Sequence, residues 1–293
     1  MEAIRKLAIV VNACKPGATE LATELAARAK ATGREVSIEH SYPIPAGTLH
    51  GCDACCVIGG DGTLLSVASE AAREGTRVMG VNMGKLGFLA MFTVDEARAS
   101  YDDFLTGNFR ISDRSLVECR SAGGQMYCAL NDVVVRSNTS RVARLRVMAD
   151  GKLVNVYSAD GLVLSTPTGS TAYNLSAGGP LIHPRAPVLA MTPICPHTLS
   201  NRGLIVGEST RMTISTEAGS SPVSVTCDGT LCFQSEPGGG MPVEVVLAPF
   251  RLPLVLRPGY AYFHLVRSKL GWSGNHIPDD QEQAPLRNDD RMR

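Results

Sequence analysis

The chain has 293 residues, of which 44% are hydrophobic and 19% are charged, a composition typical of a soluble globular protein with room for two domains. Lys and Arg together number 28, as do Asp and Glu, so the net charge of zero gives no electrostatic reason to expect nucleic acid or an anionic membrane as a partner. No apolar run reaches the roughly 18 residues of a membrane-spanning helix, and residues 1–12 lack the features of a signal peptide, so we expect a cytoplasmic protein.

The first part of the chain alternates strand and helix patterns. Continuous apolar runs predict strands that are buried on both faces, and the segments between them repeat apolar residues at helical spacing. This alternation predicts an α/β domain with a parallel, Rossmann-like sheet over residues 1–112. The predicted strands are 7–11, 57–58 and 78–81, and the predicted helices are 21–29, 64–72 and 95–105.

Short strand patterns follow from about residue 112. Turn signals such as Asp150-Gly151 and Asp228-Gly229 separate them, as is typical of hairpins. We therefore predict an antiparallel, β-sandwich-like domain over residues 113–258. The polar tail at 273–293 is predicted to be disordered. The predicted strands are 116–120, 126–135, 145–149, 153–157, 162–164, 203–206, 212–216, 223–227 and 243–247.

Nine cysteines are scattered through apolar runs, which indicates reduced and mostly buried thiols. Cys52 and Cys55 form a C-x-x-C pair, a spacing that can bind zinc or cycle between redox states. No second pair and no histidine pair nearby completes a zinc site, so we interpret these cysteines as core thiols at the start of a strand.

A glycine-rich turn connects the strand at 57–58 to the helix that follows. Gly59, Gly60 and Gly62 let the backbone turn without a Cβ in the way, and Thr63 can cap the helix. Free amides at a helix N-terminus favour a phosphate or carboxylate oxygen. The adjacent carboxylate of Asp61 could accept a proton from a hydroxyl group or help to bind a divalent cation. The alternative is a tight turn with Asp61 as a local hydrogen-bond acceptor.

Three further segments carry polar residues at strand ends. Residues 82–88 directly follow a predicted parallel strand, where ligands bind in open α/β sheets, so this segment should lie beside Asp61. Its Phe88 could stack on a base or simply be buried. Asn131 and Asp132 could bind ribose hydroxyls or a base edge, or only open a strand. The hydroxyl-rich run at 160–180 suits a phosphorylated or polyhydroxylated ligand, although such runs are often plain loops.

In order and spacing, these four segments resemble the signature segments of bacterial NAD kinases, the ATP- or polyphosphate-dependent NAD kinase family. Residues 266–272 also resemble the family's C-terminus, and the resemblance covers roughly residues 5–272. It implies an N-terminal α/β domain, a C-terminal β domain, and a last segment, 259–272, that packs back on the first domain. It further implies transfer of the γ-phosphoryl group of ATP, or of a polyphosphate phosphoryl group, to the 2′-hydroxyl of the adenosine ribose of NAD.

The resemblance also implies roles for single residues. Asp61 would face the ribose 2′-hydroxyl and take its proton, with Gly62 beside it and Phe88 against a base. Asn131 and Asp132 would contact NAD, although many members have Glu at the second position. The remaining NAD-binding residues would be Asp160, near the nicotinamide end, and Thr168, Thr171, Ala172, Tyr173 and Ser176.

A divalent cation, which we expect to be Mg²⁺, would neutralise the donor phosphates. Family members are usually homo-oligomers, so NAD, ATP and further copies of the chain in a dimer or tetramer are the expected partners. Two alternatives remain open at this point. A lipid or sugar kinase could use the same glycine–aspartate turn, and a non-catalytic NAD(P)-binding module could keep the pocket. We also expect Asp61→Asn to preserve folding and NAD binding while it removes most turnover.

Overall fold

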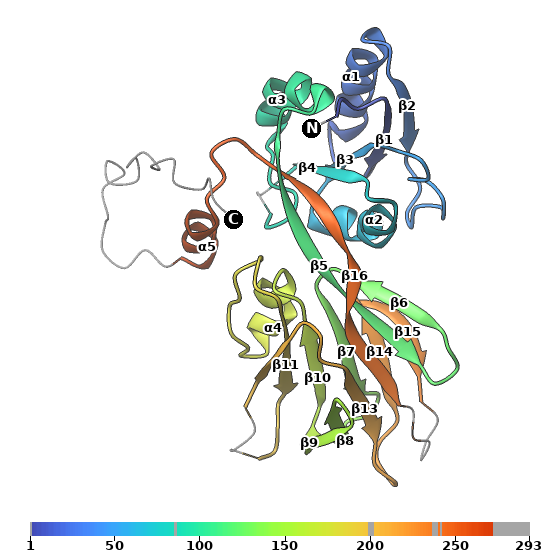
Figure 1. Cartoon of the computed structure of the whole chain (residues 1–293), viewed down its shortest axis with the longest axis vertical. Coiled ribbons are helices and arrows are strands. Elements are labelled where there is room, and N and C mark those ends of the chain that lie inside the picture. The colour runs from blue at the N-terminus through green and yellow to red at the C-terminus, as the bar shows by residue number, and fades with distance from the viewer. Residues whose placement is uncertain (1, 85–86, 199–201, 236–239, 241, 272–293) are drawn as a thin grey trace. The chain divides into compact units, whose positions relative to one another are not determined.

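The computed structural model describes residues 2–84, 87–198, 202–235, 240 and 242–271 (Figure 1). Contacts divide the chain into two compact units, Met1–Arg257 and Pro258–Arg293. The tail for which we predict disorder lies outside the described residues. Among the described helices, none has both the length and the apolar character needed to span a membrane.

The N-terminal part of the first unit is an α/β arrangement, as predicted. Four neighbouring strands run parallel in the order β2-β1-β3-β4. Residues of β1, β3 and β4 are almost all buried, because parallel sheets are covered on both faces. The elements are β1 (Lys6–Val11), α1 (Ala18–Ala31), β2 (Glu35–Glu39), β3 (Ala54–Gly59), α2 (Asp61–Glu74), β4 (Arg77–Asn82) and α3 (Val94–Thr106).

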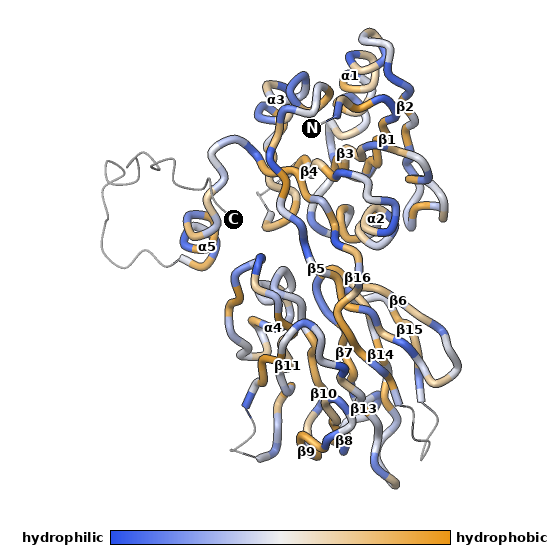
Figure 2. Tube along the Cα trace, viewed as in Figure 1, coloured by the Kyte–Doolittle hydropathy of each residue, from blue (hydrophilic) through white to orange (hydrophobic). Residues whose placement is uncertain are grey.

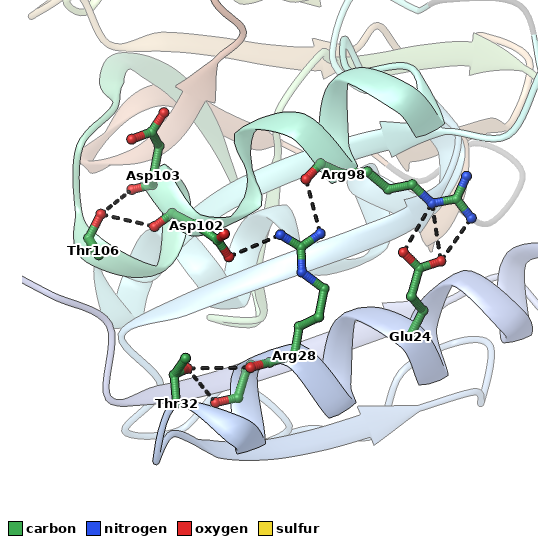
Figure 3. A network of polar contacts seen from close by, with 8 residues as sticks. Glu24, Arg28, Thr32, Arg98, Asp102, Asp103 and Thr106 are labelled. Atoms are coloured by element: carbon green, nitrogen blue, oxygen red, sulfur yellow. Dashed lines mark hydrogen bonds and ion pairs between the residues drawn. The ribbon is translucent and has the colours of Figure 1, made fainter.

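The helices α1 and α3 lie side by side and are linked by ion pairs. Arg28 of α1 bonds to Asp102 at 3.0 Å, and Arg98 of α3 bonds to Glu24 at 2.8 Å (Figure 3). The side chain of Thr93 caps α3 in a capping box with Glu96, which satisfies free amides at the helix start. Because water screens exposed charges, these ion pairs contribute little to the free energy of unfolding. They do link the surfaces of the two helices.

The three cysteines around β3 are core thiols, as we interpreted them. Cys52, Cys55 and Cys56 are buried, and burial raises the pKa of the Cys56 thiol to about 12. Thiols in such surroundings are inert rather than reactive. All nine cysteines of the chain are free.

The sheet of the α/β part continues into the C-terminal half. The end of β16 runs parallel to β4, with Leu254 opposite Val78. Its first residues pair with β13, and β5 pairs with it along most of its length. The result is one ten-stranded sheet with the path β2-β1-β3-β4-β16-β13-β8-β9. Its further strands are β5 (Arg110–Ser121), β6 (Met126–Ala129), β8 (Ala143–Ala149), β9 (Lys152–Ala159), β13 (Met212–Thr216) and β16 (Val243–Leu256).

A second, antiparallel sheet of six strands packs against this part of the first one. Val133, Leu164 and Val225 of the second sheet share a core with Leu145 and Val245 of the first, which confirms the predicted sandwich. Figure 2 shows hydrophobic residues along strands of the interior, such as β7 and β16. The second sheet has the order β12 (Leu204–Gly207), β11 (Val188–Ile194), β10 (Gly161–Ser165), β7 (Asp132–Ser137), β14 (Val223–Cys227) and β15 (Thr230–Gln234).

Several predictions of elements differ from the structure. The single strand predicted at 126–135 is two strands, because β6 pairs with β5 in one sheet and β7 pairs with β10 and β14 in the other. The helix predicted at 64–72 begins three residues earlier, at Asp61. The strands β2, β11 and β15 were not predicted, and the boundary predicted between residues 112 and 113 falls inside β5.

Two short helical turns, η1 (Gly169–Thr171) and α4 (Tyr173–Ser176), follow β10. In the second unit, the described part contains the helix α5 (Tyr262–Leu270), in which Leu265 and Val266 are buried. That residues 259–272 pack back on the α/β part stays a prediction.

Candidate active site

The glycine turn at the end of β3 leads directly into α2. A Cβ at Gly59 would overlap with the Thr63 side chain, so the tight turn requires glycine there. Gly60 is the N-cap residue and provides no side-chain cap. The prediction that Thr63 caps the helix is therefore wrong. Thr63 lies inside the first turn of α2, where its Oγ1 accepts a hydrogen bond from Asn12 Nδ2 at 3.4 Å.

This geometry leaves hydrogen-bond donors free at the start of α2. The Leu64 N–H donates to the Gly60 carbonyl at 3.1 Å and is the first to follow the helical pattern. The N–H groups of residues 61–63 have no acceptor within the helix, as at every helix N-terminus. The expected phosphate-binding loop therefore has three parts. Gly59 ends β3, Gly60 is the N-cap residue of α2, and Gly62 and Thr63 lie in the first turn of that helix.

Asp61 binds the second signature segment, which confirms that the two lie together. Its Oδ2 accepts the Phe88 N–H at 2.9 Å, and its Oδ1 accepts the N–H groups of Leu89 and Ala90 at 3.2 and 2.8 Å. A Cβ at Gly87 would overlap with this carboxylate, so a side chain is excluded there. Oδ1 already has two donors, whereas Oδ2 has one and can accept another hydrogen bond.

A cavity of about 600 Å³ opens beside Asp61. Its wall combines the end of β1, residues 10–15, with residues 40–42 and 60–63. The carboxyl ends of neighbouring parallel strands meet here, which is where ligands bind in open α/β sheets. Backbone amides of α2 and the cationic side chain of Lys15 give this cavity the chemistry of a phosphate site.

Sequence reasoning missed the other half of this cavity. Asn12 shapes it, because its Nδ2 reaches Thr63 while its Oδ1 accepts the Cys14 N–H at 3.1 Å. Asn12 follows a buried parallel strand, the same signal that identified residues 82–88, so the sequence could have revealed it. His40 and Tyr42 also line the cavity. No sequence signal places them there, because they belong to an irregular segment after an exposed edge strand.

The Asn131–Asp132 segment crosses from one sheet to the other and is held by the hydroxyl-rich run. Thr166 donates to Leu130 O from its Oγ1 at 2.6 Å and to Asn131 O from its N–H at 2.9 Å. A Cβ at Gly169 would overlap with the Asn131 carbonyl. Asp132 is buried and Asn131 is half-buried. The structure therefore brings the third and fourth signature segments together.

Much of the hydroxyl-rich run satisfies itself. Ser170 Oγ donates to Pro167 O at 2.7 Å, and Asn174 Oδ1 accepts the Thr192 hydroxyl at 2.7 Å. Thr168 differs, since its Oγ1 is buried and has no hydrogen-bond partner within the described part of the chain. A buried hydroxyl without a partner is costly to the fold. Nearby, Thr171, Ala172 and Tyr173 are half-buried and Ser176 is exposed.

Asp160 and Thr168 lie at opposite ends of β10. Asp160 precedes β10 and Thr168 follows it, so a strand of five residues, roughly 16 Å long, separates them. Among the described residues, no hydrogen bond joins the Asp61–Phe88 pair to the Asn131–Thr168 group. The structure thus contains two polar clusters, one in each half of the first unit.

Known proteins share this arrangement of segments. A model of the ATP-NAD kinase N-terminal domain matches residues 43–109, and one of the ATP-NAD kinase C-terminal domain matches residues 130–255. The NAD kinase of Chromohalobacter salexigens is 39% identical over 246 residues, covering 81% of this chain and 83% of the relative. The NAD kinase of Symbiobacterium thermophilum is 36% identical over 283 residues, covering 90% and 98%. The chain belongs to the NAD kinase family.

Solved structures show the same fold. Yeast NADH kinase, in a crystal structure described as complexed with NADH, has a TM-score of 0.78 at 22% identity and covers 94% of this chain and 90% of its own. An NAD kinase from Archaeoglobus fulgidus, described as in complex with ATP, has a TM-score of 0.73 at 21% identity, with 91% and 98% covered. The predicted resemblance to the NAD kinase family and the predicted fold class are both confirmed.

Proposed function

We propose that the chain transfers the γ-phosphoryl group of ATP to the 2′-hydroxyl of the adenosine ribose of NAD and so forms NADP. Membership in the NAD kinase family makes it a phosphotransferase and favours NAD over the lipids or sugars of the alternative kinases. The observation that carries the proposal is the carboxylate of Asp61, fixed by three amides beside a cavity with phosphate-binding chemistry. A module that only binds NAD(P) would need no such carboxylate.

The acceptor hydroxyl would bind to the remaining lone pair of Asp61 Oδ2. Because the other acceptor sites are occupied by Phe88, Leu89 and Ala90, the carboxylate has one direction left for a hydroxyl donor. Phosphoryl transfer passes through a loose transition state, in which positioning contributes more than basicity. Asp61 would therefore orient the hydroxyl first and take its proton late in the step.

The phosphoryl donor would occupy the cavity next to Asp61. Free N–H groups at the start of α2 and the ammonium group of Lys15 can stabilise the negative charge of the donor phosphates. His40 and Tyr42 at the cavity wall would contact the rest of the donor. The cavity is lined by hydrogen-bond donors that suit phosphate oxygens of any kind. Inorganic polyphosphate is therefore a second candidate for the phosphoryl donor.

Mg²⁺ would enter with the donor. Among the described residues, no group of three His, Cys, Asp or Glu side chains lies close enough together to hold a metal ion. Mg²⁺ characteristically takes most of its ligands from substrate phosphates and water. Its charge would add to that of the helix amides in neutralising the donor.

NAD would bind along the crossing segment and the hydroxyl-rich run. Asn131, Asp132 and the unpartnered hydroxyl of Thr168 are the strongest candidates, with Phe88 against a base. Residues 171–173 and Ser176 would extend the surface. Since Asp160 lies a strand away from this group, it would reach NAD from a neighbouring copy in a homo-oligomer, a dimer or tetramer. We also infer a cytoplasmic enzyme, because NAD and ATP are available there.

The direct test is an assay of NADP formation by the purified chain with Mg²⁺ and either ATP or polyphosphate. Coupling the product to an NADP-specific dehydrogenase makes the reaction visible. We expect NAD to be phosphorylated, and diacylglycerol and fructose 6-phosphate to be left unchanged. Binding of NAD without any NADP formation would overturn the proposal in favour of a binding module.

A further inference from the structure

Asp228 makes an unusual set of contacts with the crossing segment. It begins the turn between β14 and β15, with a left-handed backbone (φ 47°). Its carboxylate accepts the N–H groups of three consecutive residues, Leu130 at 2.7 Å, Asn131 at 2.8 Å and Asp132 at 3.2 Å. Its own N–H donates to the Asp132 carbonyl at 3.0 Å. One side chain thus accepts the hydrogen bonds of three consecutive backbone amides.

The crossing segment is therefore held from both sides. Its N–H groups bond to Asp228, while the carbonyls of Leu130 and Asn131 accept hydrogen bonds from Thr166. Charge-assisted hydrogen bonds are the stronger of these two sets. Without Asp228 the donors of the segment would lack acceptors at a place where the chain leaves one sheet and enters the other.

Asp228 also acts on the side chain of Asp132. Asp132 is 5% exposed, and its burial first, then the charge of Asp228, raise its pKa to about 7. Burial raises the pKa of Asp228, while the three N–H groups that its carboxylate accepts favour the ionised form and oppose that rise. A neutral Asp132 can donate a hydrogen bond to a ligand as well as accept one.

We propose that Asp228 is a positioning residue for NAD: its carboxylate fixes the backbone of residues 130–132, and its charge adds to the burial of Asp132 in favouring the neutral form of that side chain, which can donate a hydrogen bond. The proposal rests on the proposed function, because it takes Asn131 and Asp132 as NAD-binding residues. The sequence did not reveal Asp228, since an Asp-Gly pair between two strands predicts only a hairpin turn.

The test compares Asp228→Asn with Asp150→Asn. Asn tolerates the left-handed backbone, so Asp228→Asn should fold. Asp150 begins the hairpin turn before β9, has nearly the same backbone angle (φ 48°) and is followed by glycine, and its Oδ1 accepts one amide, Arg211 N–H at 2.9 Å. It lies outside the signature segments and is the matched control. Asp132→Asn, which mimics the neutral acid, is the third variant.

For Asp228→Asn we expect the KM for NAD to rise roughly ten-fold or more, the effect of losing a charge-assisted hydrogen bond, while kcat stays within about three-fold. In the wild type, kcat/KM for NAD should fall as the pH rises through about 7, where Asp132 ionises. Asp228→Asn should move this midpoint to lower pH, and Asp132→Asn should remove it. A merely structural role for Asp228 would leave the midpoint unchanged.

If Asp228→Asn matches Asp150→Asn in both KM and midpoint while the wild type phosphorylates NAD, the inference is wrong and the proposed function stands. If the wild type forms no NADP, the proposed function fails. The effect of Asp228 on Asp132 is then decided by the free energy of unfolding between pH 5 and pH 8, which should fall with rising pH and level off near the pKa of Asp132 in the folded protein. The pH at which it levels off should move lower in Asp228→Asn and stay in place in Asp150→Asn. An unchanged value in Asp228→Asn overturns the inference independently.

Discussion

At the scale of single residues, Asp61 serves two purposes that the sequence did not separate. Its carboxylate holds the backbone of Phe88, Leu89 and Ala90, and its remaining lone pair is available to a hydroxyl group. The expectation that Asp61→Asn leaves the protein otherwise intact therefore needs revision. In Asp61→Asn, one of the two carboxylate oxygens becomes an NH₂ group. This group faces a backbone N–H that it cannot accept, so the loop loses a hydrogen-bond acceptor.

We predict that Asp61→Asn lowers kcat by about a hundred-fold or more, as expected for a group that orients and deprotonates a hydroxyl. It should also lower the free energy of unfolding by about 1–3 kcal/mol, because a backbone donor loses its charged acceptor. The NADP-formation assay and chemical denaturation measure the two effects.

Asp53→Asn is the matched control for this variant. The Asp53 carboxylate also accepts two backbone N–H groups, those of Arg5 at 2.7 Å and Lys6 at 2.8 Å, but it lies at the opposite end of β3 from Asp61. Asp53→Asn should lower the free energy of unfolding to a similar extent as Asp61→Asn and leave kcat unchanged. Equal losses of kcat in both variants would mean that Asp61 acts only through the fold.

Thr168 permits a second residue-scale prediction. Its buried hydroxyl has no partner among the described residues, so Thr168→Val should leave the free energy of unfolding unchanged or raise it by up to about 1 kcal/mol. The same variant should raise the KM for NAD, because the hydroxyl would bond to the dinucleotide. Thermal unfolding and initial rates over a series of NAD concentrations give the two values.

Thr166→Val provides the contrast, because the Thr166 hydroxyl donates to Leu130 O at 2.6 Å and accepts Gly169 N–H at 3.0 Å. This variant should lower the free energy of unfolding by about 1–3 kcal/mol. If Thr168→Val proved as destabilising as Thr166→Val, the Thr168 hydroxyl would have a protein partner and no role in binding.

At the scale of elements, the segment after β4 is fitted tightly to the start of α2. A methyl group at Gly87 would overlap with the Asp61 carboxylate, so we predict that Gly87→Ala displaces the carboxylate and lowers kcat by about ten- to a hundred-fold. Gly207→Ala, at the end of β12 where a Cβ has open space, should leave turnover unchanged. Wild-type turnover in Gly87→Ala would show that Asp61 need not occupy its present position.

The sequence predicted elements where the apolar pattern was uninterrupted. The ranges 212–216 and 223–227 match β13 and β14, and the buried strands β1, β3 and β4 extend the predicted ranges by one to three residues at one or both ends. The pattern failed where pairing partners change. Leu130 continues the apolar character of β6, and the polar Asn131 follows where the chain moves between sheets. The period of the side chains carries no information on which sheet a strand joins.

Two further strand segments were not predicted because they contain proline. The prediction ended β16 at residue 247, but the strand continues to Leu256 because an irregularity in its pairing with β5, between Leu247 and Arg251, accommodates Pro249. β11 contains Pro193 and was missed altogether. The edge strand β2 was missed because its side chains are largely exposed and give no apolar run. Proline within a strand and an exposed strand without an apolar run both argue against a strand in the sequence pattern. The tertiary structure accommodates both.

At the scale of the whole molecule, the resemblance of four separate segments identified the family, yet the contacts among them required the structure. The sequence predicted that residues 82–88 lie beside Asp61, because both follow parallel strands. It could not predict that Asp228, about a hundred residues away, bonds to the Asn131 backbone, since nothing in an Asp-Gly turn specifies a distant partner.

The pH dependence of global stability follows from Asp132. The folded protein retains the Asp132 proton up to about pH 7, whereas an unfolded Asp loses it near pH 4. Between these values the unfolded state binds fewer protons, so the free energy of unfolding falls as the pH rises. We predict that Asp132→Asn is more stable than the wild type at pH 8, by as much as about 4 kcal/mol, and equally stable at pH 4. Denaturation series at the two values measure this, and equal stability at pH 8 would refute it.

The long strands β5 and β16 pair with each other along most of their length, and β16 also covers the edge of β4. The two halves that the family models match separately are therefore built on one continuous ladder of hydrogen bonds. A chimera that joins the α/β half of one relative to the sandwich of another must exchange β5 and β16 as a matched pair. Recombination at the apparent junction near residue 112 would instead cut through a strand and leave open sheet edges on both pieces, the kind of surface through which chains aggregate.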